Sequence, residues 1–152
     1  MQILRTIFLG AILLIGTNCV QAASAKIIKT LPHYLDQQGR HTIHPSLFER
    51  DAYQQELKSN PERCSGMRFD VQWKGKGIAN QLVKVRLEVR GENTPPRAIE
   101  TFEQEVKARR FSQWSSLRVS GEDFKRTGRI LAWRVSVWQN GTQLAEQKSF
   151  LW

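Results

Sequence analysis

The chain has little cysteine and little acid. It contains two cysteines, and 14 acidic residues against 23 lysines and arginines, in a total of 152 residues. One cysteine, Cys19, lies among the first 22 residues, so Cys64 stands alone in the remainder and no internal disulfide can form there. The chain also lacks an apolar run of about 20 residues, the length that a membrane-spanning helix needs. We therefore expect no disulfide scaffold and no transmembrane segment, and a buried, unreactive Cys64.

Residues 1–22 have the layout of a secretory signal peptide. Arg5 precedes the apolar run Ile7–Gly16, and a small-x-Ala exit ends at Ala22. A second small-residue cleavage site ends at Ala25, and the site after Ala22 is preferred because it lies closer to the apolar run. The segment holds one basic and no acidic residue, so the mature chain carries a net charge of +8. We expect a periplasmic or extracellular protein in which residues 23–152 form one domain.

Signatures of catalysis are also missing. The chain has no Gly-x-Ser-x-Gly motif, and Cys64 has no histidine beside it in sequence. The carboxylates Glu103 and Glu105 share one face of a predicted strand, which indicates a solvated edge before it indicates a glycosidase pair. We expect a protein that is not an enzyme and holds no cofactor, and export disfavours nucleic acid as a partner.

From Met67 onward, apolar and polar residues alternate with a period of two, which predicts half-buried antiparallel strands. The candidate strands are 26–31, 67–74, 82–90, 98–106, 114–119, 129–138 and 143–151. About seven short strands in a domain of this size predict a mainly β fold, an immunoglobulin-like antiparallel β-sandwich. Trp73 and Trp133 are expected to fill its centre, in place of the missing disulfide.

One short helix is expected between the first two strands. Residues 32–44 read as a polar loop, after which Ser46 as N-cap and Glu49 as its capping-box partner open a helix that ends near Ser59. Its apolar face is modest. We therefore expect it to cover one end of the sandwich.

The last two strands form a predicted hairpin around a type I′ turn at Asn140-Gly141. Direct pairing across this turn would point Glu146 and Lys148 into the core. Either the last strand is an edge guarded by inward charges, or a bulge near Ala145 shifts the register so that Gln147, Ser149 and Leu151 face inward. We favour the bulge.

The predicted binding face combines basic and aromatic residues on the outer side of two neighbouring strands. Its members are Lys84, Arg86, Arg90, Arg134 and Trp138. Such a face suits an anionic envelope polymer or a protein partner. Two other interpretations remain: a glycan-binding accessory domain that uses Trp138, and a solvated basic surface with no partner.

All three histidines fall within one predicted loop. His33, His41 and His44 could supply three imidazole ligands to zinc or copper, so a small metal-binding protein is the alternative function. Loop spacing does not hold ligands in place as a helix does, and the simpler interpretation is a polar surface loop.

Three segments resemble a group of small exported bacterial proteins of unknown activity. They are Arg50-Asp51-Ala52-Tyr53-Gln54, Ala132-Trp133-Arg134-Val135-Ser136-Val137-Trp138 and Lys148-Ser149-Phe150-Leu151-Trp152. The resemblance implies export and the β-sandwich fold, and it brings no catalytic or ligand residues.

Overall fold

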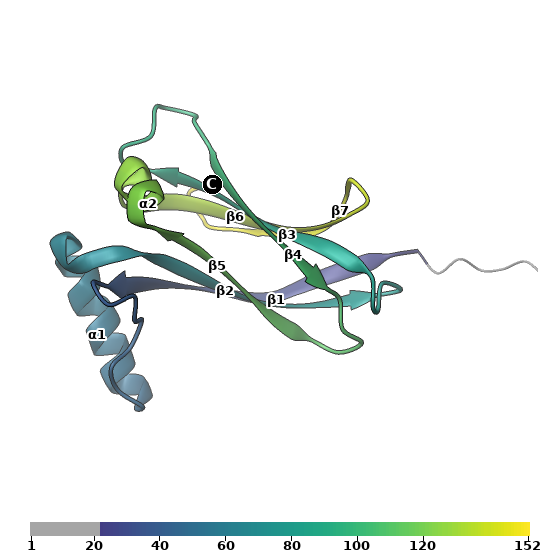
Figure 1. The fold of residues 1–152 in the computed structure, drawn as a ribbon, viewed down its shortest axis with the longest axis horizontal. Coiled ribbons are helices and arrows are strands. Elements are labelled where there is room, and N and C mark those ends of the chain that lie inside the picture. Colours follow the sequence, from purple (N-terminus) through teal and green to yellow (C-terminus); the bar gives the residue numbers. More distant parts are fainter. Residues whose placement is uncertain (1–21) are drawn as a thin grey trace, which may run out of the picture.

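The computed structural model describes residues 22–152, so the predicted signal peptide, apart from Ala22, lies outside the described residues. This part of the chain is mainly β, with seven strands in two antiparallel sheets, two α-helices and a short 3-10 helix, Pro61–Arg63. The sheets lie as two layers (Figure 1). Within 22–152, no helix has the length and apolarity that crossing a membrane requires.

The first layer is a sheet of three strands in the order β1-β2-β5: β1 (Ser24–Asp36), β2 (Cys64–Lys76) and β5 (Gln113–Ser120). Its central strand follows the predicted alternation, because Phe69, Val71 and Trp73 are fully buried and the residues between them face outward. β1 continues to Asp36, where it still pairs with β2, instead of ending at residue 31. The first part of the predicted 32–44 loop is therefore strand.

The second layer is a sheet of four strands in the order β4-β3-β6-β7: β3 (Leu82–Gly91), β4 (Glu100–Lys107), β6 (Ile130–Gln139) and β7 (Thr142–Lys148). Strand β3 pairs antiparallel with both β4 and β6. Its inward residues are buried and its outward residues alternate with them, as the sequence predicts. The outer side of this sheet is thus built from two pairs of strands, β3 with β4 and β6 with β7, that β5 separates in sequence.

The core fills the space between the two layers. Trp73 is fully buried, and its indole N–H donates a hydrogen bond to Ser115 Oγ at 3.0 Å. Trp133 is partly buried and packs edge-on against Phe69, with 6.0 Å between ring centroids. The prediction for Trp73 is confirmed, whereas Trp133 lies at the margin of the core.

The closing hairpin confirms the predicted turn and bulge. Asn140 and Gly141 both have positive φ, 47° and 80°, as a type I′ turn requires. The register shifts beside Val137, so that Gln147 lies opposite the buried Val135 while Glu146 faces outward. The prediction is wrong for the last residues, because β7 ends at Lys148 and Leu151 is exposed.

Both α-helices lie at one end of the sandwich (Figure 1). Helix α1 (Leu47–Ser59) begins after Ser46, whose side chain accepts a hydrogen bond from the Glu49 N–H, as predicted. It buries Tyr53 and Leu57. Helix α2 (Gly121–Thr127) is not predicted, because seven residues, most of them charged, are too few to show an apolar period.

Candidate functional site

The five residues predicted to form a binding face do lie together, on the outer side of the four-stranded sheet. Antiparallel pairing of β3 with β6 places Lys84 opposite Trp138, and Glu88 opposite Arg134. We call this outer side the four-stranded face. Its charged residues are the cations Lys84, Arg86, Arg90, Lys107, Arg134 and Lys148 and the carboxylates Glu88, Glu103, Glu105 and Glu146.

Carboxylates hold several of these cations in place. Glu103 binds Lys84 Nζ and Arg86 Nε, each at 2.7 Å. The hydrogen bonds from Lys84 and then Arg86 outweigh burial and lower the pKa of the Glu103 carboxyl. Glu88 accepts two hydrogen bonds from Arg134, from Nε at 2.7 Å and from Nη2 at 2.8 Å. With six cations against four carboxylates, the four-stranded face has only a small positive charge.

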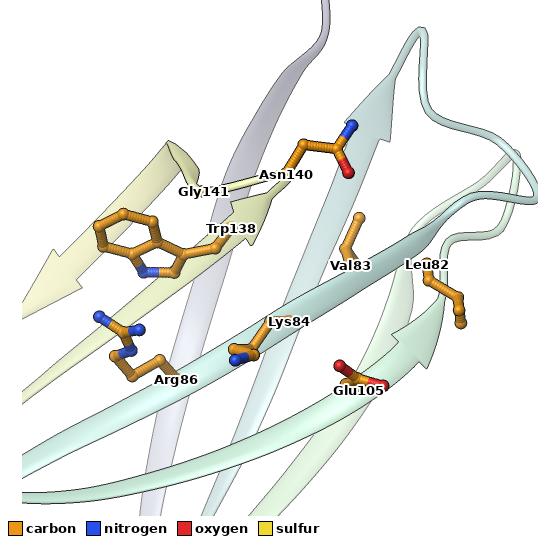
Figure 2. A pocket seen from close by; sticks show the side chains of 8 residues that line it. All are labelled: Leu82, Val83, Lys84, Arg86, Glu105, Trp138, Asn140 and Gly141. Carbon is orange, nitrogen blue, oxygen red and sulfur yellow. The ribbon is translucent and has the colours of Figure 1, made fainter.

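The aromatic residues of this face are also engaged. The Arg86 guanidinium lies 4.6 Å from the centre of the Trp138 ring, and the Trp138 N–H donates to Ser136 Oγ at 2.7 Å. Figure 2 shows Trp138 and Arg86 beside a hollow of about 230 Å³ near the Asn140-Gly141 turn. Arg90 and Arg134 both lie over Trp152, at 4.5 and 4.9 Å. Lys84, Arg86 and Arg134 are therefore held in ion pairs and Trp138 in a cation–π contact, whereas Arg90 contacts the Trp152 ring and its buried Nε has no hydrogen-bond partner.

The outer side of the three-stranded sheet has a different charge balance. The sequence of its strands provides only one outward carboxylate, Asp70. The cations on this side are Lys26, Lys29, Lys74, Lys76, Arg68 and Arg118, joined by Arg50 from α1. Among residues 22–152, Arg68 is the one member of this group with a carboxylate within 4 Å. We call this outer side the three-stranded face.

Trp114 is the aromatic residue of the three-stranded face. It is 49% exposed, at the start of β5, in register with Gln72 and through it with Lys29. Lys29 Nζ lies 5.3 Å from the centre of its ring, at the outer limit of a cation–π contact. Trp114 therefore offers an open aromatic surface, in contrast to the covered ring of Trp138.

A hollow of about 450 Å³ lies on this face where the sheet meets the loop before α1. We call it the histidine hollow, and its lining residues are Leu31, His33, His41, Arg50, Arg68, Asp70, Trp114 and Ser116. They come from all three strands of the sheet, from the loop and from the helix. Only the folded sheet brings them together.

Asp70 contacts three other residues that line the histidine hollow. Its Oδ2 accepts hydrogen bonds from Arg68 Nε at 3.1 Å and Nη2 at 2.6 Å, and it lies 3.6 Å from His33 Nε2. Its Oδ1 accepts a hydrogen bond from the Ser116 hydroxyl. Both oxygens are thus used in orienting the neighbours on each side.

His33 and His41 form an imidazole pair, with ring centroids 5.1 Å apart. Arg68 Nη2 lies 3.4 Å from His41 Nε2. Burial is the main cause that lowers the pKa of each histidine below 6.5; Arg68 and Arg50 lower it further, and Asp70 opposes them. Both imidazoles are therefore neutral at pH 7, and His41 Nε2 can accept from the guanidinium.

Gln54 and Asp36 attach the loop and α1 to the end of β1. The Gln54 amide accepts from the Tyr34 N–H at 2.7 Å and donates to the carbonyls of Tyr34 and His41, at 3.0 and 2.7 Å. Asp36 is buried, which alone would raise its pKa, but hydrogen bonds from the Arg40 N–H, the Tyr53 hydroxyl and the Arg40 side chain hold that pKa at about 2. These contacts fix His41 and Arg50 over the sheet.

The structure brings together two of the three predicted metal ligands. His44 lies elsewhere, with Nδ1 3.9 Å from Glu49 Oε1. In the described part of the chain, no three His, Cys, Asp or Glu side chains are grouped so that they could hold a metal ion. Cys64 is half-buried, and its thiol donates to the Leu57 carbonyl at 3.2 Å; burial raises the pKa of this thiol.

Sequence reasoning did not assemble the three-stranded face. Lys26 and Lys74 lie on predicted strands, but strict alternation would place Lys29 on the opposite side from Lys26, and the register shift between Ile27 and Lys29 is what brings both to one side. Arg68, Asp70 and Ser116 also occupy outward positions of predicted strands. The missing information was that β5 pairs with β2 rather than with β4.

Comparisons with known proteins identify a fold and no family. No protein-family model matches the chain, and no curated protein matches it. Among solved structures, a crystal structure of a protein from Akkermansia muciniphila is similar with a TM-score of 0.51 and 14% identity, over 84% of this chain and 71% of that one. At this identity the likeness shows the fold alone.

Proposed function

We propose that this protein is an exported, non-catalytic binding module for an anionic polymer of the cell envelope, and that it binds through the three-stranded face. Export rests on the signal-peptide pattern of residues 1–22. The single observation that carries the binding proposal is the charge balance of that face: seven cations against one carboxylate. Such a surface attracts a polyanion over a Debye length of about 8 Å at physiological salt.

Comparison of the two sheets supports this choice of face. On the four-stranded face Glu103 and Glu88 already neutralise Lys84, Arg86 and Arg134. A polyanion would have to displace these carboxylates. The lysines of the three-stranded face have no such partner among the described residues, so they gain a counter-charge only when a ligand binds.

The immunoglobulin-like class is part of the proposal. The orders β1-β2-β5 and β4-β3-β6-β7 fit a seven-strand sandwich of that class in which the fourth strand joins the sheet of the third, sixth and seventh. Sandwiches of this kind commonly bind through exposed surfaces, and the present proposal uses a sheet face.

The hydrogen bonds in the histidine hollow favour binding over catalysis. A nucleophilic serine needs a base that accepts its proton. The Ser116 hydroxyl donates to Asp70 Oδ1, while His33 lies against Oδ2 of the same carboxylate. The carboxylate thus separates hydroxyl from imidazole, in contrast to a triad, where the imidazole lies between them.

The test is retention of residues 23–152 on immobilised dextran sulfate, with neutral dextran as the reference matrix. The variant Lys29→Glu/Lys74→Glu changes two exposed cations of the three-stranded face. We expect it to elute at a much lower salt concentration than the wild type, because each lost phosphate- or sulfate-type contact reduces the salt dependence by about one ion.

The matched control is Arg97→Glu/Lys148→Glu, which makes the same change in net charge at exposed cations away from the three-stranded face. We expect it to elute close to the wild type. Equal losses in the two variants would show that net charge alone causes retention and would overturn the assignment. Thermal melting of both variants confirms that they are folded.

A further inference from the structure

We propose that the histidine hollow is the subsite for an acidic sugar residue of that polymer, with its carboxylate against Arg50, Arg68 and the two imidazoles and the next sugar stacked on Trp114. This inference rests on the proposed function and adds the chemical class of the ligand. It follows from the cations of the hollow, from its apolar residues and from the protonation state of its two histidines.

The cationic corner of the hollow has one carboxylate, Asp70, beside two guanidinium groups and two imidazoles. Arg68 Nη2 and His41 Nε2 face each other at 3.4 Å, and among residues 22–152 no carboxylate lies within 4 Å of the Arg50 guanidinium. Asp70 cannot fill this place, because Ser116 takes one of its oxygens and Arg68 and His33 share the other. A ligand carboxylate would complete the hydrogen bonding of the guanidinium and of both imidazoles.

The rest of the hollow is apolar. Leu31 and Trp114 line it together with the charged residues, and both are exposed enough to contact a ligand. Sugar rings offer apolar C–H faces that suit an aromatic surface. A bare inorganic anion would leave this part of the hollow unused.

The spacing of the two parts indicates an extended ligand. Trp114 lies in register with Gln72, and His33 with Arg68, four residues further along β2. At about 3.3 Å per residue, the two rows are about 13 Å apart along the strand. One ligand that reaches both must be an oligomer, consistent with a polymer chain that continues over the lysines of the same face.

Binding in this corner should take up protons. Both imidazoles are neutral when the hollow is empty, because burial and the guanidiniums of Arg68 and Arg50 lower their pKa, although Asp70 opposes this. A bound carboxylate adds a second negative neighbour, which raises the pKa of each histidine. The affinity for the ligand must then rise as the pH falls from the pKa of the histidines in the complex toward their pKa in the free protein.

The experiment is calorimetry of a galacturonate trimer at pH 7.5 and 5.5, in two buffers of different ionisation enthalpy, with inorganic phosphate as the second probe. Uronate carboxylates stay ionised over this range, so any pH dependence belongs to the protein. We expect trimer affinity to rise about fivefold at the lower pH with measurable proton uptake, and phosphate to bind more weakly than the trimer.

Two variants separate the parts of the hollow. His33→Asn/His41→Asn should remove proton uptake and pH dependence, while the matched His44→Asn, outside the hollow, should keep both. Trp114→Ala should weaken the trimer about fivefold and leave phosphate unchanged. Melting curves check that each variant is folded.

The inference is overturned if the trimer binds without proton uptake, or does not bind, or if phosphate binds as tightly and Trp114→Ala changes neither. Dextran sulfate retention, measured on the same proteins, distinguishes the two proposals. Retention that survives a failed trimer experiment removes only the subsite, since the lysines of the three-stranded face do not line the hollow. Retention that does not depend on Lys29 and Lys74 removes the proposed function itself.

Discussion

The two outer faces of the sandwich contain similar basic and aromatic residues, but they differ in whether the basic residues are paired within the protein. On the four-stranded face Arg86 and Arg134 form ion pairs with glutamates, and Arg86 and Arg90 lie over tryptophan rings, so these arginines already have partners within the protein. On the three-stranded face Lys26 lies opposite Lys74, whereas Lys29 and Lys76 lie opposite the uncharged Gln72 and Ser24, so no carboxylate lies across from any of these lysines. The number of basic residues on a strand therefore says less about binding than the identity of the residues across from them.

The first prediction that tests this comparison concerns Asp36, which attaches the loop and α1 to the end of β1 next to the histidine hollow. Asp36→Asn should destabilise the fold by about 3 kcal/mol, because a buried carboxylate with several hydrogen bonds loses its charge while Arg40 stays cationic. It should also weaken polymer binding at the hollow end of the three-stranded face. Urea denaturation measures the first effect, with the exposed Asp51→Asn on α1 as control.

The pH dependence of Asp36 has a definite sign. Its folded pKa of about 2 lies below the ordinary 3.8, so its contribution to stability is fully present above 3.8 and is lost as the pH falls toward 2. The Asp36→Asn variant should lack this portion of the acid transition. An unchanged acid transition would contradict the role given to Asp36.

A second change makes the four-stranded face resemble the other one. Glu88→Gln removes the partner of the half-buried Arg134 and should cost about 2 kcal/mol, while Glu103→Gln, at a more exposed pair of cations, should cost about 0.5 kcal/mol. Both variants should increase retention on dextran sulfate, because each substitution releases cations of the four-stranded face from the carboxylate that now pairs with them. Retention equal to the wild type in both variants would show that ion pairing is not what keeps this face from binding.

The smallest effect sharpens the comparison through the histidines. Because the folded pKa of His33 and His41 lies below 6.5, the unfolded chain binds more protons, and stability present above 6.5 should decline as the pH falls toward 5. Thermal melting from pH 7.5 to 5.5 measures the decline. The variant His33→Asn/His41→Asn should show a smaller decline in melting temperature. A saturating galacturonate oligomer should reverse the decline, because its carboxylate stabilises the protonated form of both histidines.

Local patterns predicted most of the strands and both ends of α1. Alternation around Phe69 and Val85, the Asn140-Gly141 turn and the Ser46 cap each act over a few neighbouring residues, so one sequence suffices to detect them. The 26–31 strand was predicted too short because Pro32 and His33 read as loop, although pairing with β2 keeps them extended. Helix α2 has no comparable local signal.

The candidate site was harder to predict because it depends on which strands become neighbours. The five residues of the predicted binding face were correctly expected on one outer side, yet nothing local shows that Glu103 would reach both Lys84 and Arg86. The acidic row on β4 was predicted to be an exposed edge, and β4 is indeed an edge strand, but one member of the row, Glu103, also pairs with Lys84 and Arg86 of β3. His33, Arg68 and Ser116 come together only through pairing across three strands.

Gln54 has a consequence beyond the position of His41. Strand β1 lies at the margin of its sheet, and an unpaired margin is a template on which another chain can add a strand. By accepting from the Tyr34 N–H and donating to the Tyr34 carbonyl, the Gln54 amide imitates one residue of a neighbouring strand. Helix α1 thereby blocks strand addition at this point, and the Gln54 side chain protects the protein from pairing with copies of itself through β1.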